Sequence, residues 1–307
     1  MIGDTEASSF DALERPLPMS SRSPAWLDAQ YNNRARVSDS AVLLERWAST
    51  SRFVREQMAC SLDLAYGAAP SERLDVFPSD VSQAPVLVIL HGGWWRALDK
   101  SDMSFLASAF TEEGAMVVIP NYALCPEVSM DRIPLQLTQA LAWVWRHAAD
   151  YGGDPNRIVL IGHSAGGHLA AMLSCCDWKA VACDLPRHLI KGAMSVSGVH
   201  DLEPIRKTPF LQADLRLDAA AVRRLSPVHF PAPEAPFYAV VGADESAEFK
   251  RQNRLIRQAW GARAVPVCEE IAGCNHFDIL HDLADPAGRS HLLARRLLDL
   301  RWYSPLL

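Results

Sequence analysis

Short apolar runs alternate with amphipathic segments over most of this chain. Between residues 61 and 271 there are eight strand-like segments, and five of them are short apolar runs bounded by residues that break regular structure. Runs of this kind are typical of buried strands, and their alternation with helical segments indicates an α/β fold whose mostly parallel, twisted sheet has helices on both faces. The eight predicted strands are residues 61–66, 72–77, 85–90, 115–120, 157–161, 191–196, 236–241 and 265–271. The first two, joined by a Gly-Ala-Ala-Pro turn, form an antiparallel hairpin.

Three segments between or after these strands have helical periodicity. Apolar residues recur at helical spacing from Ile133 to Ala148, and the Gly pair at 152–153 marks the end of that helix. Residues 249–260 form a second predicted helix, stopped by Gly261, and residues 292–300 a third. A further helix is expected directly after Ser164.

The ends of the chain and one internal stretch depart from this alternation. Residues 1–24 are rich in Ser, Pro and acidic residues and predict a flexible leader, whereas residues 25–58 predict a helical arm. Residues 201–236 hold six prolines and no clear strand, so we expect an insertion over the carboxyl edge of the sheet. We therefore predict one domain over residues 25–307, with a small cap made by the arm and the insertion.

Composition and charge exclude several classes of function. Of the 307 residues, 49% are hydrophobic and 21% charged, which suffices for a sizeable core, and the net charge of −6 without a Lys/Arg cluster disfavours nucleic-acid binding. No run approaches the roughly 20 apolar residues of a membrane span, and the first ten residues do not resemble a signal peptide. We expect a cytoplasmic protein with no membrane association.

The cysteines and histidines do not predict a metal site. The seven cysteines are scattered, and the adjacent pair Cys175 and Cys176 suits neither a mutual disulfide nor metal binding. The histidines lack metal-ligand spacing with cysteines or carboxylates. Reduced thiols, no metal and no cofactor are expected.

Two glycine-containing motifs carry the chemistry. Residues 91–95 (HGGWW) and 162–166 (GHSAG) each follow a predicted buried strand directly. The second has the form G-x-S-x-G, which places a serine on a sharp strand-to-helix turn with its Oγ exposed. Ser164 is therefore the predicted nucleophile of a serine hydrolase.

A serine hydroxyl needs a base within hydrogen-bond reach. In the architecture that carries G-x-S-x-G, the base lies near the end of the chain, after the acid. His276, in the loop after the last predicted strand, fits this order. His281 is the alternative, although it lies within a predicted helical segment.

The acid that orients the base should follow the strand at residues 236–241, next to the strand end that precedes the base. Asp244 is the predicted acid. Glu245 and Glu248 compete with it, and Asp201 is a more distant candidate, expected to brace the insertion.

The oxyanion of an acyl-transfer intermediate requires preorganised N–H donors. Ala165 supplies one, because it follows the nucleophile. Gly92 and Gly93 allow their loop to turn N–H groups toward the same point, and Trp94 is a possible third donor from that loop. His91 is expected to fasten the loop.

With these motifs the chain resembles the α/β-hydrolase superfamily, and within it the kynurenine formamidase group more than the hormone-sensitive-lipase-like esterases. The resemblance extends from Tyr31 onward. Esterases usually have a third glycine where this chain has Trp94 followed by Trp95. Further matches are the segments at residues 121–127 (NYALCPE), 197–202 (SGVHDL) and 276–279 (HFDI). The resemblance gives Ser164, Asp244 and His276 the triad roles.

The resemblance implies hydrolysis of an N-formyl aromatic amine such as N-formylkynurenine, through an acyl-enzyme on Ser164. A small-molecule acyl ester or amide is thus the expected partner, and the resemblance also implies a homodimer. A general short-chain carboxylesterase is the alternative, and a catalytically inactive ligand-binding homologue is the alternative of a different class.

Aromatic side chains are the candidates for the substrate pocket. Trp94 is expected to narrow the acyl side to a formyl or acetyl group and to offer an aromatic face to the leaving amine, unless it and Trp95 only pack the loop. Tyr31 and Tyr122 are the remaining candidates.

Overall fold

The computed structural model describes residues 23–300, and its centre is one eight-stranded sheet of order β1-β2-β4-β3-β5-β6-β7-β8. β2 pairs antiparallel with both neighbours, whereas β3 to β8 are parallel. This confirms the predicted hairpin and the mostly parallel sheet. The strands are β1 Ser61–Ala65, β2 Arg73–Phe77, β3 Ala84–Leu90, β4 Met116–Pro120, β5 Gly153–His163, β6 Ile190–Val196, β7 Phe237–Gly242 and β8 Val267–Ile271.

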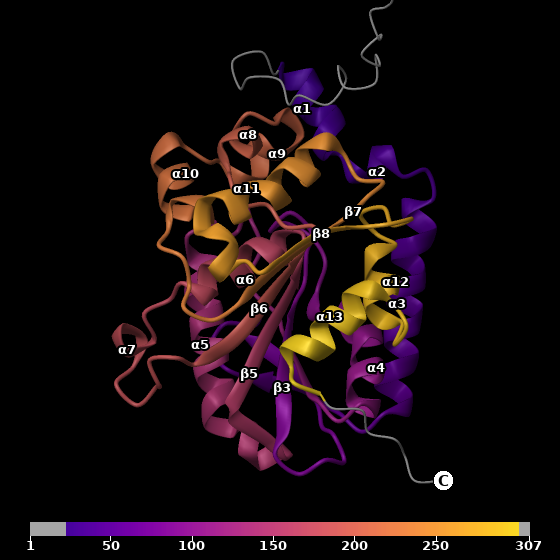
Figure 1. Ribbon diagram of the computed structural model, residues 1–307, viewed down its shortest axis with the longest axis vertical. Coiled ribbons are helices and arrows are strands. Elements are labelled where there is room, and N and C mark those ends of the chain that lie inside the picture. Colours follow the sequence, from indigo (N-terminus) through magenta and orange to yellow (C-terminus); the bar gives the residue numbers. More distant parts are fainter. Residues whose placement is uncertain (1–22, 301–307) are drawn as a thin grey trace, which may run out of the picture.

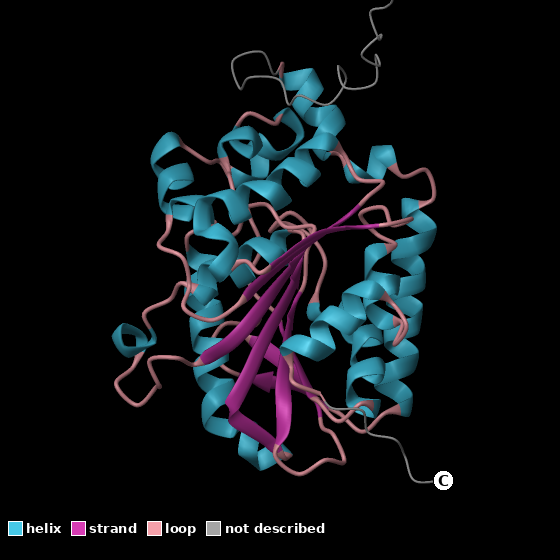
Figure 2. Ribbon diagram, in the orientation of Figure 1, coloured by secondary structure: helices cyan, strands magenta, loops and turns pink. Residues whose placement is uncertain are grey.

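Helices cover both faces of the sheet, as the alternation of strands and helices predicts (Figures 1 and 2). One face packs against α5 Arg132–His147, α6 Ala165–Ser174 and α11 Ala247–Ala264. The other packs against α3 Ser40–Gln57, α4 Ala107–Glu112, α12 Ile279–Ala284 and α13 Arg289–Leu297. Because both faces are covered, the central strands are apolar throughout, and all seven residues of β3 are buried.

The helix ends follow the glycines of the sequence. α5 continues into a 3₁₀ turn, η3 Ala148–Tyr151, which ends at Gly152 with φ 83°. α11 begins two residues before its predicted start and is interrupted at Gly261, where φ is 81°. Gly152 adopts the left-handed conformation that ends helices, whereas Gly261 combines its positive φ with ψ of 161°, a conformation open essentially to glycine alone.

The insertion after β6 is helical. It forms α8 Glu203–Arg206, α9 Pro209–Leu215 and α10 Ala219–Leu225, followed by η4 Pro227–His229. Proline occupies the first turn of α8, α9 and η4, a position where its missing N–H costs no hydrogen bond. Three of the six prolines that suggested an irregular cap therefore lie at helix starts. Between β5 and β6, α7 Trp178–Val181 stands apart from the other helices (Figure 1).

The arm forms α1 Pro24–Tyr31 and α2 Asn33–Arg36 before α3. The predicted leader lies outside the described residues, except for Ser23, which caps α1, and Pro24, which begins it. α1 lies beside α9 and α11 at the end of the sheet where the parallel strands finish (Figure 1). Among residues 23–300, no helix has the length and apolar character needed to cross a bilayer. The remaining element is η2 Lys100–Leu106.

One buried hydrogen-bond group fixes the arm to the sheet domain. The Tyr31 hydroxyl donates to Glu248 Oε2 at 2.8 Å and accepts from Gln252 Nε2 at 3.1 Å. Arg251 binds both Glu248 and Asp201. Burial, followed by the charge of Glu248, raises the pKa of Tyr31, so its hydroxyl stays a donor.

Replacing Tyr31 by Phe should weaken this attachment. Loss of a buried hydrogen bond to a charged group costs about 1.5–3 kcal/mol. We expect Tyr31→Phe to lower the free energy of unfolding by that amount in urea titrations. Tyr151→Phe is the control, because within the described part of the chain the Tyr151 hydroxyl has no hydrogen bond. Equal stability of the two variants would contradict this account of the arm.

Candidate active site

Ser164 sits on a strained turn between β5 and α6. Its φ of 56° and ψ of −115° are unfavourable for a residue with a side chain, and such outliers concentrate at functional sites. Gly162 and Gly166 make this turn possible. A Cβ on Gly162 would lie 2.0 Å from Gly166 O, and a Cβ on Gly166 would lie 2.1 Å from Leu90 O. The G-x-S-x-G prediction is thus matched by the local geometry.

Ser164, His276 and Glu245 form a continuous hydrogen-bonded relay. The Ser164 hydroxyl donates to His276 Nε2 at 3.1 Å, and His276 Nδ1 donates to Glu245 Oε2 at 2.6 Å. All three residues are buried. In this arrangement the imidazole can take the serine proton while the carboxylate stabilises the imidazolium that forms.

Asp244 does not take part in this relay, so the prediction of the acid is wrong by one residue. The chain turns directly after β7, where the Glu245 N–H donates to Gly242 O at 3.1 Å. This turn leaves Asp244 exposed and directs the buried Glu245 side chain under the strand ends toward His276. The longer Glu side chain then spans the remaining distance.

The remaining candidates for acid and base make contacts away from the nucleophile. Glu248 binds Tyr31 of the arm, and Arg251 joins Glu248 to Asp201. His281 lies half-buried in α12, with Nδ1 3.8 Å from Asp278, and is not a neighbour of Ser164. The choice of His276 as the base therefore agrees with the geometry.

Ser197 is a site residue that the sequence reasoning missed. Its hydroxyl donates to Glu245 Oε1, which also accepts the Gly242 N–H at 2.9 Å. A buried carboxylate is stable only when its oxygens are hydrogen-bonded, and these contacts satisfy the oxygen that His276 leaves free. The position of Ser197 directly after β6, next to β7, was the available signal.

The loop after β3 brings the first motif against the nucleophile. A Cβ on Gly92 would lie 3.2 Å from Ser164 Cβ. Gly93, Trp94 and Trp95 follow with φ of 96°, 54° and 55°. Positive φ at three successive residues marks a tight turn after β3, and the N–H groups of such a turn can bind an anion.

The predicted oxyanion donors are free to act. Within residues 23–300, no protein acceptor takes the N–H of Gly93, Trp94 or Ala165. Ala165 is also the first residue of α6, so the positive end of that helix adds to its N–H. The arrangement can hold a negative oxygen next to Ser164 Oγ.

His91 fastens the loop, as the sequence suggested. Its ring stacks on Tyr122 with centroids 4.0 Å apart and binds Asn121 Oδ1 at 3.1 Å, while the Tyr122 hydroxyl donates to His91 O at 2.8 Å. Burial lowers the pKa of His91, so the ring stays neutral. Tyr122 therefore supports the loop from behind and does not line the substrate pocket.

A cavity of about 220 Å³ opens at Ser164. Pockets for drug-sized ligands are larger, roughly 300–1,000 Å³, so this one suits a compact substrate. Of the four aromatic residues predicted to bind substrate, only Trp94 lines it. Trp95 and Tyr31 are fully buried and, with Tyr122, pack around the loop, so those three predictions are wrong.

Most of the cavity wall was not predicted. It comes from the arm and from single residues of the loops: Asn32, Asn33, Arg34, Leu44, Trp47, Arg96, Ala97, Leu98, His163, Phe210 and Phe277. The insertion supplies Phe210 alone. The arm therefore contributes more to the predicted cap over the site than the insertion does. Its segment at residues 31–36 (YNNRAR) was the sequence signal for these lining residues.

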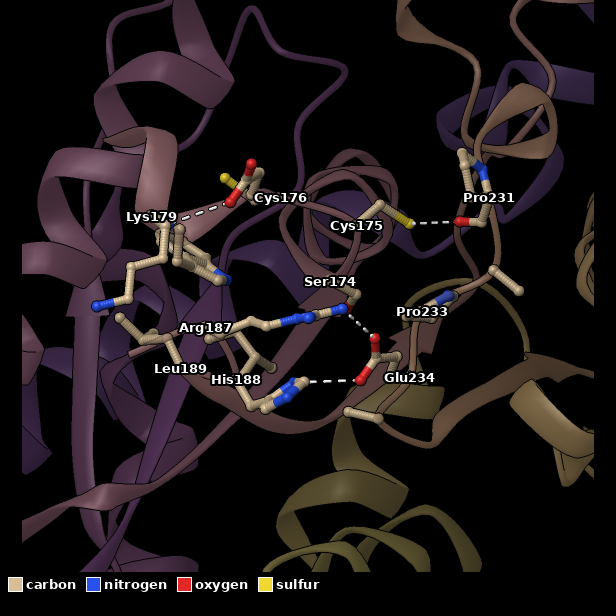
Figure 3. Close-up of a pocket in the computed structure, with 15 residues that line it drawn as sticks. Ser174, Cys175, Cys176, Lys179, Arg187, His188, Leu189, Pro231, Pro233 and Glu234 are labelled. Carbon is tan, nitrogen blue, oxygen red and sulfur yellow. Dashed lines mark hydrogen bonds and ion pairs between the residues drawn. The ribbon is translucent and has the colours of Figure 1, made fainter. Parts of the chain in front are cut away.

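A second cavity of about 460 Å³ lies at the far end of α6 and holds none of the predicted site residues. Figure 3 shows the Arg187 and His188 side chains turned to Glu234, at 2.9 Å and 3.4 Å, whereas Lys179 points away from that carboxylate. Among residues 23–300, no cluster of His, Cys, Asp or Glu could hold a metal ion. The catalytic geometry is confined to the first cavity.

Comparisons with known proteins agree with this geometry. The BD-FAE family profile matches residues 74–241, from β2 to β7. The chain is also 31% identical to the kynurenine formamidase of Danio rerio over 308 residues, which cover 97% of this chain and 99% of that enzyme. The chain belongs to the kynurenine formamidase family. This confirms the resemblance drawn from the motifs and makes the chain a serine hydrolase.

The chain is also similar to two other hydrolases. A candidate thioesterase from Silicibacter sp. TM1040 is 30% identical and superposes with a TM-score of 0.76 over 89% of this chain and 98% of that one. The esterase LipQ of Mycobacterium tuberculosis is 27% identical over 80% of this chain and 62% of its own length. The fold is therefore the predicted α/β-hydrolase fold.

Replacing each of the two neighbouring acids, Glu245 and Asp244, by its amide tests the relay. Glu245 Oε1 already receives two donors, so Glu245→Gln should keep its oxygen there and turn its NH₂ toward His276 Nδ1. That forces the proton onto Nε2, which can no longer accept from Ser164. We expect kcat for p-nitrophenyl acetate to fall roughly 10³–10⁴-fold. Asp244→Asn is the matched control and should retain kcat. A larger fall in kcat for Asp244→Asn than for Glu245→Gln would identify Asp244 as the acid of the relay.

Adding a methyl group to Gly93 tests the oxyanion loop. A Cβ there would lie 2.0 Å from Ala97 O, and φ is positive, so Gly93→Ala must shift the loop. Loss of one oxyanion donor lowers kcat roughly 10²–10³-fold. Gly152→Ala has the same kind of φ but an open surrounding and should keep kcat. If stopped-flow acylation rates are the same in both variants, the loop after β3 does not stabilise the oxyanion.

Proposed function

We propose that this protein hydrolyses aryl formamides, with N-formylkynurenine as the substrate and kynurenine and formate as products. Ser164 acts as nucleophile, His276 as general base and acid, and Glu245 as the acid that orients it. The N–H groups of Gly93, Trp94 and Ala165, with Gly92 shaping the loop, hold the oxyanion. Full-length similarity to a kynurenine formamidase supports the substrate class.

The reaction follows from these roles. Ser164 Oγ attacks the formyl carbon while its proton passes to His276 Nε2, and the carbonyl oxygen becomes an oxyanion. When the C–N bond breaks, the imidazolium gives that proton to the departing aryl amine. Water then attacks the formyl ester, with His276 taking its proton, and formate leaves as the proton returns to Ser164.

The position of Trp94 is the observation that carries the choice of substrate. Its half-buried indole belongs both to the oxyanion loop and to the cavity wall, in place of the small glycine common in esterases. Tyr31, Phe249 and Phe210 surround the ring at centroid distances of 5.9–6.2 Å and hold it in place. A fixed indole next to the reacting carbonyl leaves room for a formyl group and offers a face to an aromatic amine.

A short-chain carboxylesterase is the second candidate, because the same relay cleaves esters and the esterase LipQ is among the relatives. The intact Ser164–His276–Glu245 relay disfavours a protein that only binds ligands. A homodimer and a cytoplasmic location stay predictions of the sequence.

Side-by-side kinetics decide between the candidates. We expect kcat/KM to be higher for N-formylkynurenine than for p-nitrophenyl acetate, and to decline from formyl to acetyl to butyryl esters of one phenol, because Trp94 restricts the acyl side. Ser164→Ala is the control for enzyme-independent hydrolysis. A wild-type enzyme that cleaves the butyryl ester fastest and leaves the formamide intact is a carboxylesterase.

A further inference from the structure

The cavity that holds Ser164 carries unbalanced positive charge. Two arginines line it, Arg34 and Arg96, and no aspartate or glutamate does. Glu245 is not part of the wall because it is buried behind His276. A ligand in this cavity therefore meets two guanidinium groups and, among the described residues, no carboxylate.

The two arginines differ in their partners, because Arg96 is already paired with a carboxylate. Arg96 Nη1 binds the Asp214 carboxylate, and it also donates to the Phe210 carbonyl at 3.0 Å. The Arg96 guanidinium lies 5.4 Å from the centre of the Phe210 ring. Arg34 has an exposed side chain, and no carboxylate or carbonyl within residues 23–300 binds its guanidinium. In the second cavity, Glu234 already binds the arginine, Arg187 (Figure 3).

The residue before Arg34 adds an unsatisfied amide. Asn33 lines the same cavity, is 6% exposed, and its Nδ2 is buried with no hydrogen-bond partner among the described residues. A buried amide N–H without a partner costs about 1–3 kcal/mol, and a ligand oxygen reached by a turn of this side chain would recover that cost. Asn33 and Arg34 are adjacent and together supply an amide donor and a guanidinium fork.

The backbone beneath these two side chains is held firmly. The Asn32 side chain caps α2 by accepting the Ala35 N–H at 3.2 Å, and the Ser40 hydroxyl binds Arg34 O at 3.1 Å. Arg36 Nη1 donates to Ala29 O at 3.2 Å, which joins α2 to α1. The arm thus presents Asn33 and Arg34 from a fixed position, as a preorganised subsite requires.

We propose that Asn33 and Arg34 form a carboxylate-binding subsite that selects substrates whose aromatic leaving group carries a carboxylate-bearing side chain. This rests on the proposed function and deepens it, because the amino-acid end of N-formylkynurenine supplies such a group. The guanidinium fork matches the two carboxylate oxygens, and the Asn33 amide donates to the same oxygens or to a carbonyl next to them. The formyl group then faces Ser164 while the charged end stays under the arm.

Inhibition by the product tests the subsite apart from the formamidase activity. Hydrolysis of p-nitrophenyl acetate is the assay, with kynurenine as the carboxylate-bearing inhibitor and 2-aminoacetophenone as the inhibitor that lacks the amino-acid group. We expect the wild type to bind kynurenine more tightly. Arg34→Gln should raise the inhibition constant of kynurenine roughly 10–100-fold, more than that of 2-aminoacetophenone, because hydrogen bonds to charged groups contribute about 1.5–3 kcal/mol.

Two further variants separate binding from a structural effect. Arg52→Gln removes an exposed charge from α3 of the same arm, at a residue that neither lines the cavity nor holds α2, and it should keep the wild-type ratio of the two inhibition constants. Arg34→Lys should restore part of that ratio, since it keeps the charge without the fork. Added salt should weaken kynurenine inhibition in the wild type and have less effect in Arg34→Gln.

The outcomes distinguish this subsite from the proposed function. Equal inhibition of the wild type by the two ketones, or equal losses in the Arg34 and Arg52 variants, overturns the subsite. Failure to turn over N-formylkynurenine, with kynurenine inhibition still dependent on Arg34, refutes the formamidase proposal and leaves the carboxylate subsite standing for an esterase.

Discussion

The close contact of three backbone segments at Ser164 is the constraint on which the rest of the site depends. The end of β5, the start of α6 and the end of β3 approach so closely that neither Gly162 nor Gly166 has room for a Cβ. Because β3 and β5 are neighbours in the sheet, this contact also brings the loop after β3 to the nucleophile. Two motifs seventy residues apart in the sequence therefore share one point in space, and the strain at Ser164 is supported by the packing of the central sheet.

The same edge of the sheet supplies the remaining partners. Ser197 follows β6, Glu245 follows β7 and His276 follows β8, so each neighbouring strand in turn contributes one polar group. Parallel strands end on the same side, which makes this edge the place where side chains distant in sequence converge. The buried carboxylate is stable there because both of its oxygens are hydrogen-bonded, and it in turn orients the imidazole.

Local signals account for what the sequence could predict. Apolar runs and breakers located all eight strands, and the motif contexts located Ser164 and His276. The choice between Asp244 and Glu245 depended on a turn of a few residues and on side-chain length, neither of which has a periodic signature. The start of β5 was missed because residues 153–156 are glycine and polar residues that suggest a turn. Tyr31, Tyr122 and Trp95 were misassigned because aromatic residues near a site also fill its supporting core, and sequence alone does not separate the two roles.

The arm has a consequence for how such an enzyme can diversify. Asn33, Arg34, Leu44 and Trp47 contribute to the cavity from one continuous stretch near the beginning of the chain, whereas the reacting groups come from the sheet edge far downstream. The part of the wall that comes from the arm is thus encoded apart from the reacting groups, whereas Trp94 belongs both to the wall and to the oxyanion loop. Exchange of a short segment of the arm, provided it retains the contact of Tyr31 with α11, would reshape that part of the cavity while leaving the catalytic sheet untouched.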